Sequence, residues 1–414
     1  MRRWSLFSAL PFLGLAIVLL SAPSAWAGPK YKVLHSFGAG NDGYAPEAPV
    51  AVDARGNIYG TTLVGGAYGL GTVFELVRGR GGWAEHVLHS FCYTCGDGYW
   101  PQAALTLDAL GNLYGTTVRG GTYDYGIAFE LSPEPDGWTE TVIHSFCSGG
   151  SHGDDGCQPY SNLIFDAAGD LYGTTGGGGP SYDGTAYELS PGSAGWSEAT
   201  ICGFKGGGDG RAPFAGLTWD KSGNLYGTTS EGGAYGEGTV YELARTSGDA
   251  WEERILYSFG ANRYDGTDPV TAVVFDTAGN LYGATPVGGH NLCFSYYDCG
   301  TVYKLTPDGH GGWKETRIHD FAQNADGFNP NGIAIDAVGN LYGTTWDGGS
   351  GGGVVFKLAP LPHGKWKYTV LHTFSGPDGG VPEAGVTLDG KGHIYGTTFA
   401  GGAYGNGVVF ELTP

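Results

Sequence analysis

The chain is poor in basic residues. Its 414 residues include 21 Lys and Arg against 41 Asp and Glu, a formal net charge of −20 at pH 7. Because an acidic surface repels phosphate groups, this composition argues against nucleic acid and anionic lipid as partners. It leaves cations and neutral or basic ligands open, and it also fits the general solubility of an extracellular protein.

Long hydrophobic runs are absent after residue 27. Before it, two arginines precede an apolar stretch at 6–20, and Ala25-Trp26-Ala27 forms a small-x-small cleavage site. We expect residues 1–27 to be a signal peptide removed after Ala27; a retained membrane helix is disfavoured because the apolar stretch is short. No later segment is apolar enough to span a bilayer, and no hydrophobic tail ends the chain. We therefore expect a secreted protein, extracellular or periplasmic, without a C-terminal anchor.

Helical periodicity is missing as well, since no stretch after residue 27 keeps apolar residues on one helix face for three turns. In its place one phrase, Gly-Asn-Leu-Tyr-Gly-Thr-Thr, recurs seven times with small changes. Its period of about 56 residues is typical of propellers and solenoids. The tyrosines of the seven copies are Tyr59, Tyr114, Tyr172, Tyr226, Tyr282, Tyr342 and Tyr395.

Each repeat holds four short runs rich in Val, Ile, Thr, Tyr and Phe and separated by Gly, Pro and Asp, which is the composition of β-strands. From the axis outward, strand A is the run that ends in Asp, as at 50–53, and strand B is the repeated phrase. Strand C follows a glycine-rich loop, as at 71–76. Strand D opens with Trp and ends in His-Ser-Phe, as at 83–91.

Seven repeats of four strands predict an all-β fold, a seven-bladed β-propeller with four antiparallel strands per blade. A parallel β-helix is the alternative, but its coils are shorter than this period. We expect residues 28–414 to form this single domain. The chain starts with a D strand at 31–37 and ends with a C strand at 407–412. The N-terminal strand is therefore expected to complete the last blade and close the ring, which covers an open sheet edge.

The repeated phrase, followed by Gly-Gly-x-x-Gly-x-Gly-Thr-Val-Phe-Glu-Leu, resembles the GloVer tandem repeat of exported bacterial proteins known as choice-of-anchor proteins. The resemblance covers roughly residues 30–414. It implies export, and because the family has no assigned catalytic residues, none carry over. The sequence departs from anchored members in lacking a sorting segment at its end.

Seven cysteines in an exported chain indicate disulfides. We expect Cys202 to be unpaired, since it stands where most repeats have histidine. A redox role for Cys92-Tyr-Thr-Cys95 is disfavoured because the strand-helix setting of such motifs is missing. The expected pairs, all close in sequence, are Cys92 with Cys95, Cys147 with Cys157, and Cys293 with Cys299.

No metal or cofactor is expected. The sequence offers no four ligands at zinc-site spacing, and the Asp of a repeated Asp-Gly-x-x-Pro motif is an ordinary turn former. A histidine recurs in strand D of five repeats, but copies on separate blades cannot form one active site, so we expect them to be structural. The same holds for the tryptophans that open strand D, which we expect to pack between blades.

A functional site has to break the sevenfold pattern. The up-and-down strand order places the Asp-Gly-x-x-Pro loops, which join D to A, beside the glycine-rich loops, which join B to C, on one face around the channel mouth. Loops on a rigid scaffold usually carry function. The departures from the repeat on this face, and hence the candidate ligand-binding residues, are Tyr99, Trp100, Arg211, Asp268, Trp346 and Asp347.

Tyrosines in the glycine-rich loops, such as Tyr68 and Tyr404, add aromatic groups to that face. Aromatic rings among polar groups bind sugars by stacking and hydrogen bonding, although these tyrosines also suit loop packing. We expect a monomeric, non-catalytic binding or interaction propeller for a carbohydrate or a peptide, without catalytic residues. The alternatives are a propeller-type glycoside hydrolase, lyase or lactonase, or a surface or matrix structural protein.

Overall fold

The computed structural model describes residues 28–150, 153–246, 250–293, 297–322 and 325–414. The expected signal peptide, 1–27, lies outside the described residues. In the part of the chain that is described, no helix is long and apolar enough to cross a membrane. The regular helical elements there are three 3-10 turns, η1 (Tyr93–Cys95), η2 (Gly207–Asp209) and η3 (Pro362–Gly364).

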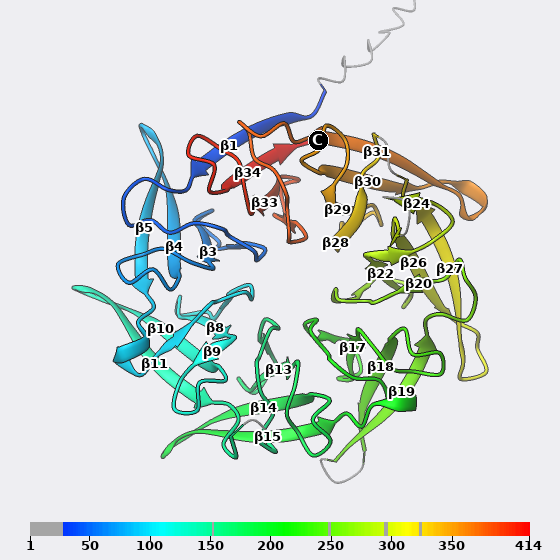
Figure 1. Cartoon of the computed structure of the whole chain (residues 1–414), viewed down its shortest axis with the longest axis horizontal. Helices are drawn as coiled ribbons and strands as arrows, with labels where there is room; N and C mark the ends of the chain where they lie inside the picture. The colour runs from blue at the N-terminus through cyan, green and yellow to red at the C-terminus, as the bar shows by residue number, and fades with distance from the viewer. Residues whose placement is uncertain (1–27, 151–152, 247–249, 294–296, 323–324) are drawn as a thin grey trace, which may run out of the picture.

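Seven four-stranded antiparallel sheets surround a central axis, which confirms the propeller (Figure 1). The A strands are β2 (Ala51–Val52), β7 (Thr106–Leu107), β12 (Ile164–Phe165), β16 (Thr218–Trp219), β21 (Val274–Phe275), β28 (Phe328–Ile335) and β32 (Thr387–Leu388). The B strands are β3 (Ile58–Thr62), β8 (Leu113–Thr117), β13 (Leu171–Thr175), β17 (Leu225–Thr229), β22 (Leu281–Thr285), β29 (Leu341–Asp347) and β33 (Ile394–Thr398).

The outer half of each blade consists of longer strands. The C strands are β4 (Thr72–Gly79), β10 (Ile127–Glu134), β14 (Thr185–Gly192), β18 (Thr239–Arg245), β26 (Thr301–Pro307), β30 (Val354–Pro360) and β34 (Val408–Thr413). The D strands are β5 (Gly82–Ser90), β11 (Gly137–Ser145), β15 (Gly195–Gly203), β19 (Trp251–Ser258), β27 (Trp313–Asp320), β31 (Trp366–Thr373) and β1 (Lys30–Ser36).

Ring closure occurs as predicted. Strand β1 pairs antiparallel with β34, from Lys30 opposite Thr413 to Ser36 opposite Val408. The first and last strands of the described chain thus lie side by side in blade 7, whose outermost strand is β1 (Figure 1). Immediately after β1, Phe37 is fully buried and packs against Phe74 of blade 1.

The glycine inside each B strand marks a close approach, again as expected. A Cβ atom on Gly60 would lie 2.6 Å from the ring of Phe74 in strand C of the same blade. The other six blades repeat this arrangement with Phe or Tyr in strand C. The repeated Gly therefore makes room for a large aromatic side chain that fills the blade.

Neighbouring blades are joined by repeated hydrogen bonds. The residue before the proline of each Asp-Gly-x-x-Pro motif donates its N–H to a B–C loop carbonyl of the preceding blade, as Ala45 does to Asn406 at 2.9 Å. The first threonine of the phrase reaches the next blade, as when the Thr61 hydroxyl donates to the Ala103 carbonyl. In blade 5 Ala284 replaces this threonine and has no such hydroxyl.

The repeated histidines contact the Asp-Gly-x-x-Pro loops of their own repeats. Each bonds the Asp of the loop that follows its own strand, as His35 does with Asp42 at 3.1 Å and His372 with Asp378 at 2.9 Å. The tryptophans that open strand D pack between blades. Trp196 of blade 3, for example, meets Tyr114 of blade 2 with ring centroids 6.2 Å apart.

All three predicted disulfides are present: Cys92–Cys95, Cys147–Cys157 and Cys293–Cys299. Cys202 is the free cysteine, and it is half-buried. Burial, with Glu253 nearby, raises the pKa of its thiol to about 12, so it is a poor nucleophile.

Peptide mapping of the oxidised protein is expected to find these three pairs and a single unpaired cysteine. Under native conditions Cys202 should react with iodoacetamide more slowly than a free peptide thiol, because the thiolate is disfavoured. Finding Cys202 in a cross-link, or alkylated as fast as a free thiol, would refute this assignment.

Candidate functional site

All seven blades contribute to the mouth of the axial channel. A cavity of about 220 Å³ lies at the start of the A strands. Its lining includes the residue that follows the proline of each Asp-Gly-x-x-Pro motif, and we call these seven residues the post-proline ring. The ring consists of Glu47, Gln102, Tyr160, Phe214, Val270, Asn331 and Glu383.

The post-proline ring is divided into two halves. Blades 6, 7, 1 and 2, which are neighbours across the ring closure, contribute two carboxylates and two amides. Blades 3, 4 and 5 contribute Tyr160, Phe214 and Val270. The sevenfold backbone therefore presents a polar wall on one side of the mouth and an apolar, largely aromatic wall on the other.

The polar wall is hydrogen-bonded across the blades. Gln102 Nε2 of blade 2 donates to Glu47 Oε2 of blade 1 at 2.6 Å. Burial, together with the charge of Glu383, raises the pKa of Glu47 to about 7. Burial also raises the pKa of Glu383, and a hydrogen bond from Trp346 partly offsets this rise. Two half-buried carboxylates thus face one another at the mouth, and near neutral pH one of them readily holds a proton.

The aromatic wall is rigid. The rings of Tyr160 and Phe214 pack edge to face, with centroids 5.0 Å apart and planes at 90°. Gly176 lies behind them, and a Cβ atom there would come within 2.6 Å of Phe214. Both rings are half-buried and keep part of their surface free toward the channel.

Trp346 is the predicted site residue that the structure brings to the mouth. Its side chain is 41% exposed and donates to Glu383. Three other predicted residues take part in short ladders between the D–A and B–C loops. Tyr99 pairs with Arg119, Arg211 pairs with Glu231 and also forms an ion pair with it, and Asp347 pairs with Phe328.

Trp100 and Asp268 occupy another repeated position, directly before the proline. All seven residues there have a positive φ, between 55° and 61°. Trp100 is 41% exposed and packs against Tyr99. Burial, with Glu231 and Glu237 nearby, raises the pKa of Asp268. None of the six predicted residues lines the axial cavity, Trp346 reaching it only through its hydrogen bond to Glu383, so the six do not form one site.

Two of the loop tyrosines, Tyr235 and Tyr404, lie away from the mouth. Tyr404 lies beside Gly38 and Tyr235 beside Gly260, both just after the outermost strand of a blade. Tyr68, Tyr235 and Tyr404 are more than half exposed. Tyr235 and Tyr404 therefore border the outer rim of the face and do not line the channel.

The residues that sequence reasoning missed are Glu47, Glu383, Tyr160 and Phe214. Each stands one position after an invariant proline of the repeat, where charge and size vary from copy to copy. Aligning the seven copies position by position shows this variation.

Comparisons with solved structures agree with the fold. A protein from Bacteroides uniformis ATCC 8492, provisionally assigned as a 6-phosphogluconolactonase, has a TM-score of 0.52 at 12% identity, covering 82% of this chain and 88% of that chain. A protein from Lactobacillus plantarum gives 0.52 at 15% identity, with 83% and 88% covered. At these identities the likeness concerns the fold alone. No curated protein matches the sequence.

The repeat itself matches a known family. The Gloeobacter/Verrucomicrobia repeat aligns three times in succession, to residues 24–154, 150–293 and 294–414, and so spans nearly the whole chain. These alignments agree with the resemblance of the repeated phrase to the GloVer repeat. The chain belongs to the Gloeobacter/Verrucomicrobia repeat family.

Proposed function

We propose that this protein is an exported, monomeric, non-catalytic binding propeller that takes a saccharide at the mouth of its axial channel. The observation that carries the proposal is the division of the post-proline ring into a polar wall and an aromatic wall. Three disulfides support export, because such bonds persist in oxidising compartments.

The two walls match the two kinds of surface on a sugar. The C–H face of a pyranose packs on aromatic rings, here Tyr160 and Phe214, while its hydroxyl groups bond carboxylates and amides such as Glu47 and Gln102. The cavity is smaller than the 300–1,000 Å³ that is usual for drug-sized ligands. It therefore suits a single sugar unit or the end of a longer chain.

A printed array of neutral oligosaccharides, followed by titration calorimetry with the best of them, tests this proposal. Phe214→Ala is expected to weaken binding about fivefold, because one aromatic contact contributes on the order of 1 kcal/mol. Glu383→Gln is expected to weaken it as well, since it removes a charged acceptor. Leu110→Ala and Glu134→Gln, at exposed positions outside the cavity lining, serve as controls. Equal affinity in all four variants would place the site elsewhere.

A second candidate function, glycoside hydrolysis, is favoured by the carboxylate pair of Glu47 and Glu383. A carboxyl group whose pKa is raised to about 7 beside a second carboxylate is the usual pairing of a general acid with its partner. Mass spectrometry of the bound oligosaccharides after long incubation distinguishes the two functions. Cleavage of the sugars by the parent protein but not by Glu47→Gln would establish an enzyme. Sugars that remain intact would support a binding protein.

A further inference from the structure

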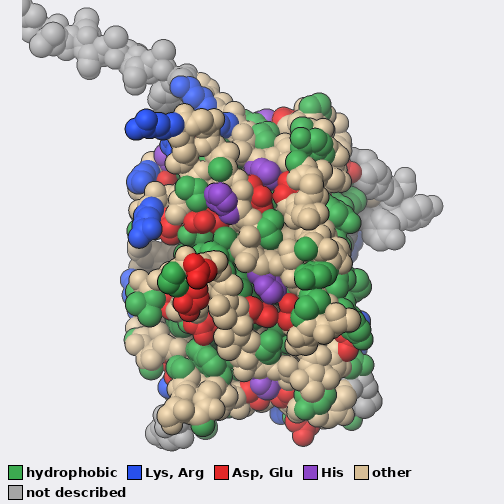
Figure 2. All heavy atoms as spheres, turned by 90° about the vertical axis from the view of Figure 1, so that its left-hand side faces the viewer, with side chains coloured by type: hydrophobic (Ala, Val, Ile, Leu, Met, Phe, Trp, Pro, Cys, Tyr) green, Lys and Arg blue, Asp and Glu red, His purple; other side chains and the backbone are tan. Residues whose placement is uncertain are grey.

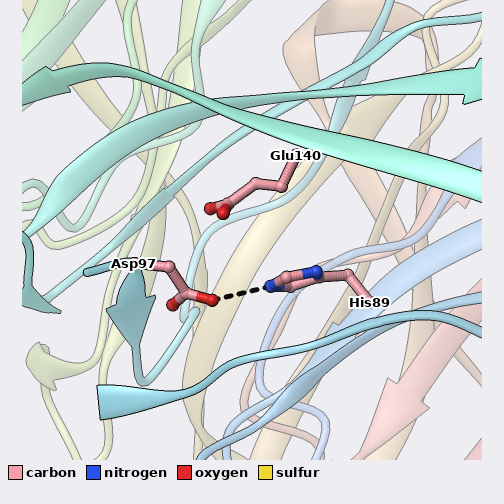
Figure 3. A group of neighbouring side chains, drawn as sticks. All are labelled: His89, Asp97 and Glu140. Atoms are coloured by element: carbon pink, nitrogen blue, oxygen red, sulfur yellow. Dashed lines mark hydrogen bonds and ion pairs between the residues drawn. The ribbon is translucent and has the colours of Figure 1, made fainter. Parts of the chain in front are cut away.

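Outside the channel, His89, Asp97 and Glu140 converge at the interface between blades 1 and 2 (Figure 3). His89 comes from β5 of blade 1, Asp97 from the loop after it, and Glu140 from β11 of blade 2. His89 Nε2 and Asp97 Oδ2 are 2.9 Å apart, and one ligand atom from each of the three residues lies within 4.8 Å of the others.

Hydrogen bonding accounts for only part of this cluster. Asp97 is buried, and its Oδ1 accepts the N–H of Cys92 while Oδ2 meets His89. The carboxylate of Glu140 points toward both residues (Figure 3), yet its Oε1 is buried and accepts no hydrogen bond from the described residues. Two carboxylates buried side by side repel one another unless a proton or a cation lies between them.

We propose that His89, Asp97 and Glu140 bind a divalent transition-metal ion, for which Zn²⁺ is the best-matched probe. One imidazole nitrogen and two carboxylate oxygens are ligands that Zn²⁺ accepts, and the two negative charges balance the ion. Ligand atoms around a tetrahedral Zn²⁺ lie about 3.4 Å apart, given bonds of about 2.0–2.2 Å. A modest rotation of the Glu140 side chain closes the site. Water or an external ligand completes the coordination.

The same residue set recurs at the two adjoining interfaces. His35 and Asp42 face Glu85, and His144 and Asp155 face Glu198, with His to Asp distances of 3.1 and 3.0 Å. Figure 2, which views the outer wall of the ring, shows histidines spaced along the wall with acidic side chains beside them. Of these three sets, the one at His89 brings its ligand atoms within 4.8 Å of one another among the described residues, so the proposal is confined to it.

The remaining four interfaces provide an internal comparison. Two have Cys202 or Tyr257 in place of the histidine. The other two keep the histidine but replace the glutamate with a tyrosine that stacks on it. Tyr31 lies over His372 with centroids 3.6 Å apart, and Tyr368 lies over His319 at 4.2 Å. The repeat therefore packs well without the third ligand, so a glutamate is not required at this position for folding.

The expectation of no metal rested on the lack of four ligands at zinc-site spacing and on the turn-forming role of the repeated Asp residues. The Asp97 carboxylate does stabilise the loop turn, because it accepts a hydrogen bond from the backbone N–H of Cys92. The third ligand comes from the next repeat, and only the inter-blade contact places it there. The proposal concerns a site apart from the axial mouth and does not depend on what the mouth binds.

Calorimetric titration of EDTA-treated protein with ZnCl₂, together with the visible spectrum of the Co²⁺ form, tests the site. We expect Zn²⁺ to bind and to raise the melting temperature. Glu140→Gln is expected to weaken the tightest site at least about tenfold, the loss usual when a ligand shell is damaged. Glu315→Gln, at the interface that has Tyr257 in place of histidine, is expected to leave Zn²⁺ binding unchanged.

Glu140→Tyr provides a second variant. It is expected to fold, because Tyr31 and Tyr368 occupy the equivalent position at two other interfaces, and it is also expected to lose the tightest site. The absence of binding by Zn²⁺, Co²⁺ and Mn²⁺ at millimolar concentration would overturn the proposal. It would equally fail if both Glu140 variants bound Zn²⁺ like the parent protein, since the ion would then sit on exposed histidines such as His86.

Discussion

Deletion of residues 28–37 is expected to abolish cooperative folding of the whole propeller. The deletion removes β1, which forms the outer edge of blade 7 and pairs with β34 along its length. It also removes Leu34 and Phe37, which are buried between blades 7 and 1. Losing two such side chains costs about 5–10 kcal/mol, which approaches the 5–15 kcal/mol that stabilises a typical domain.

Thermal unfolding followed by circular dichroism, with size-exclusion chromatography, measures this effect against the chain 28–414. The truncated chain is expected to lose its sharp transition and to self-associate through the open edge of β34. A synthetic peptide of residues 28–37 should restore the transition in trans, and a scrambled peptide should not. A truncated chain that melts like the reference would show that blade 7 does not need its fourth strand.

Stability is expected to fall as the pH rises from about 5 to 7, because of buried glutamates at the blade interfaces. Burial raises the pKa of Glu253 to about 7, with Asp209 raising it further and Lys205 lowering it. Burial likewise raises that of Glu315 to about 7. The other groups that face these two glutamates are Cys202 for Glu253, and Asp265, Arg317, Asp320 and Tyr257 for Glu315.

The direction follows from where the proton is held. Between pH 4.5 and 7 the folded protein keeps protons on these glutamates that the unfolded chain has released, so folding binds protons and a rise in pH disfavours it. Above about pH 7 both states are ionised, and the loss is complete. After discounting for partial solvent exposure, each group contributes on the order of 1 kcal/mol. Two together correspond to about 2.5 °C in melting temperature for a domain of this size.

The double variant Glu253→Gln, Glu315→Gln isolates this effect. Its melting temperature, recorded from pH 5 to 8, is expected to vary about 2.5 °C less than that of the parent protein. His35 and His372, whose pKa values burial lowers, oppose the trend below pH 6.5 in both proteins and so cancel in the comparison. Parallel profiles for the two proteins would mean that the pKa values of these two glutamates are the same in the folded and the unfolded protein.

The sequence alone was sufficient for the fold because its repeats are explicit. Seven copies of one phrase give the blade count, and the unmatched D strand at 31–37 gives the closure. The lengths of the strands were harder to predict from the sequence. Six of the A strands are only two residues long. The exception, β28, is continuous because repeat 6 has one residue fewer between Pro330 and Asp336 than the other repeats have.

The site was only partly accessible from sequence, for a physical reason. Trp346 stood out because a large exposed aromatic is unusual after the repeated threonines. Glu47 and Glu383 look like ordinary surface acids until the ring closes and places them at one cavity. Likewise Tyr160 and Phe214 become a wall only when their blades are neighbours around the axis.

The polar wall of the mouth spans the place where the ring closes. Glu383 belongs to the last repeat and Glu47 to the first, so they are distant in sequence and meet only after β1 has paired with β34. A ligand that engages both carboxylates binds the closed ring and not the open one. By linkage, such a ligand clamps the seam and slows its opening. Ligand binding thus reports the fraction of molecules in which the ring has closed, because a chain with an open ring does not bind.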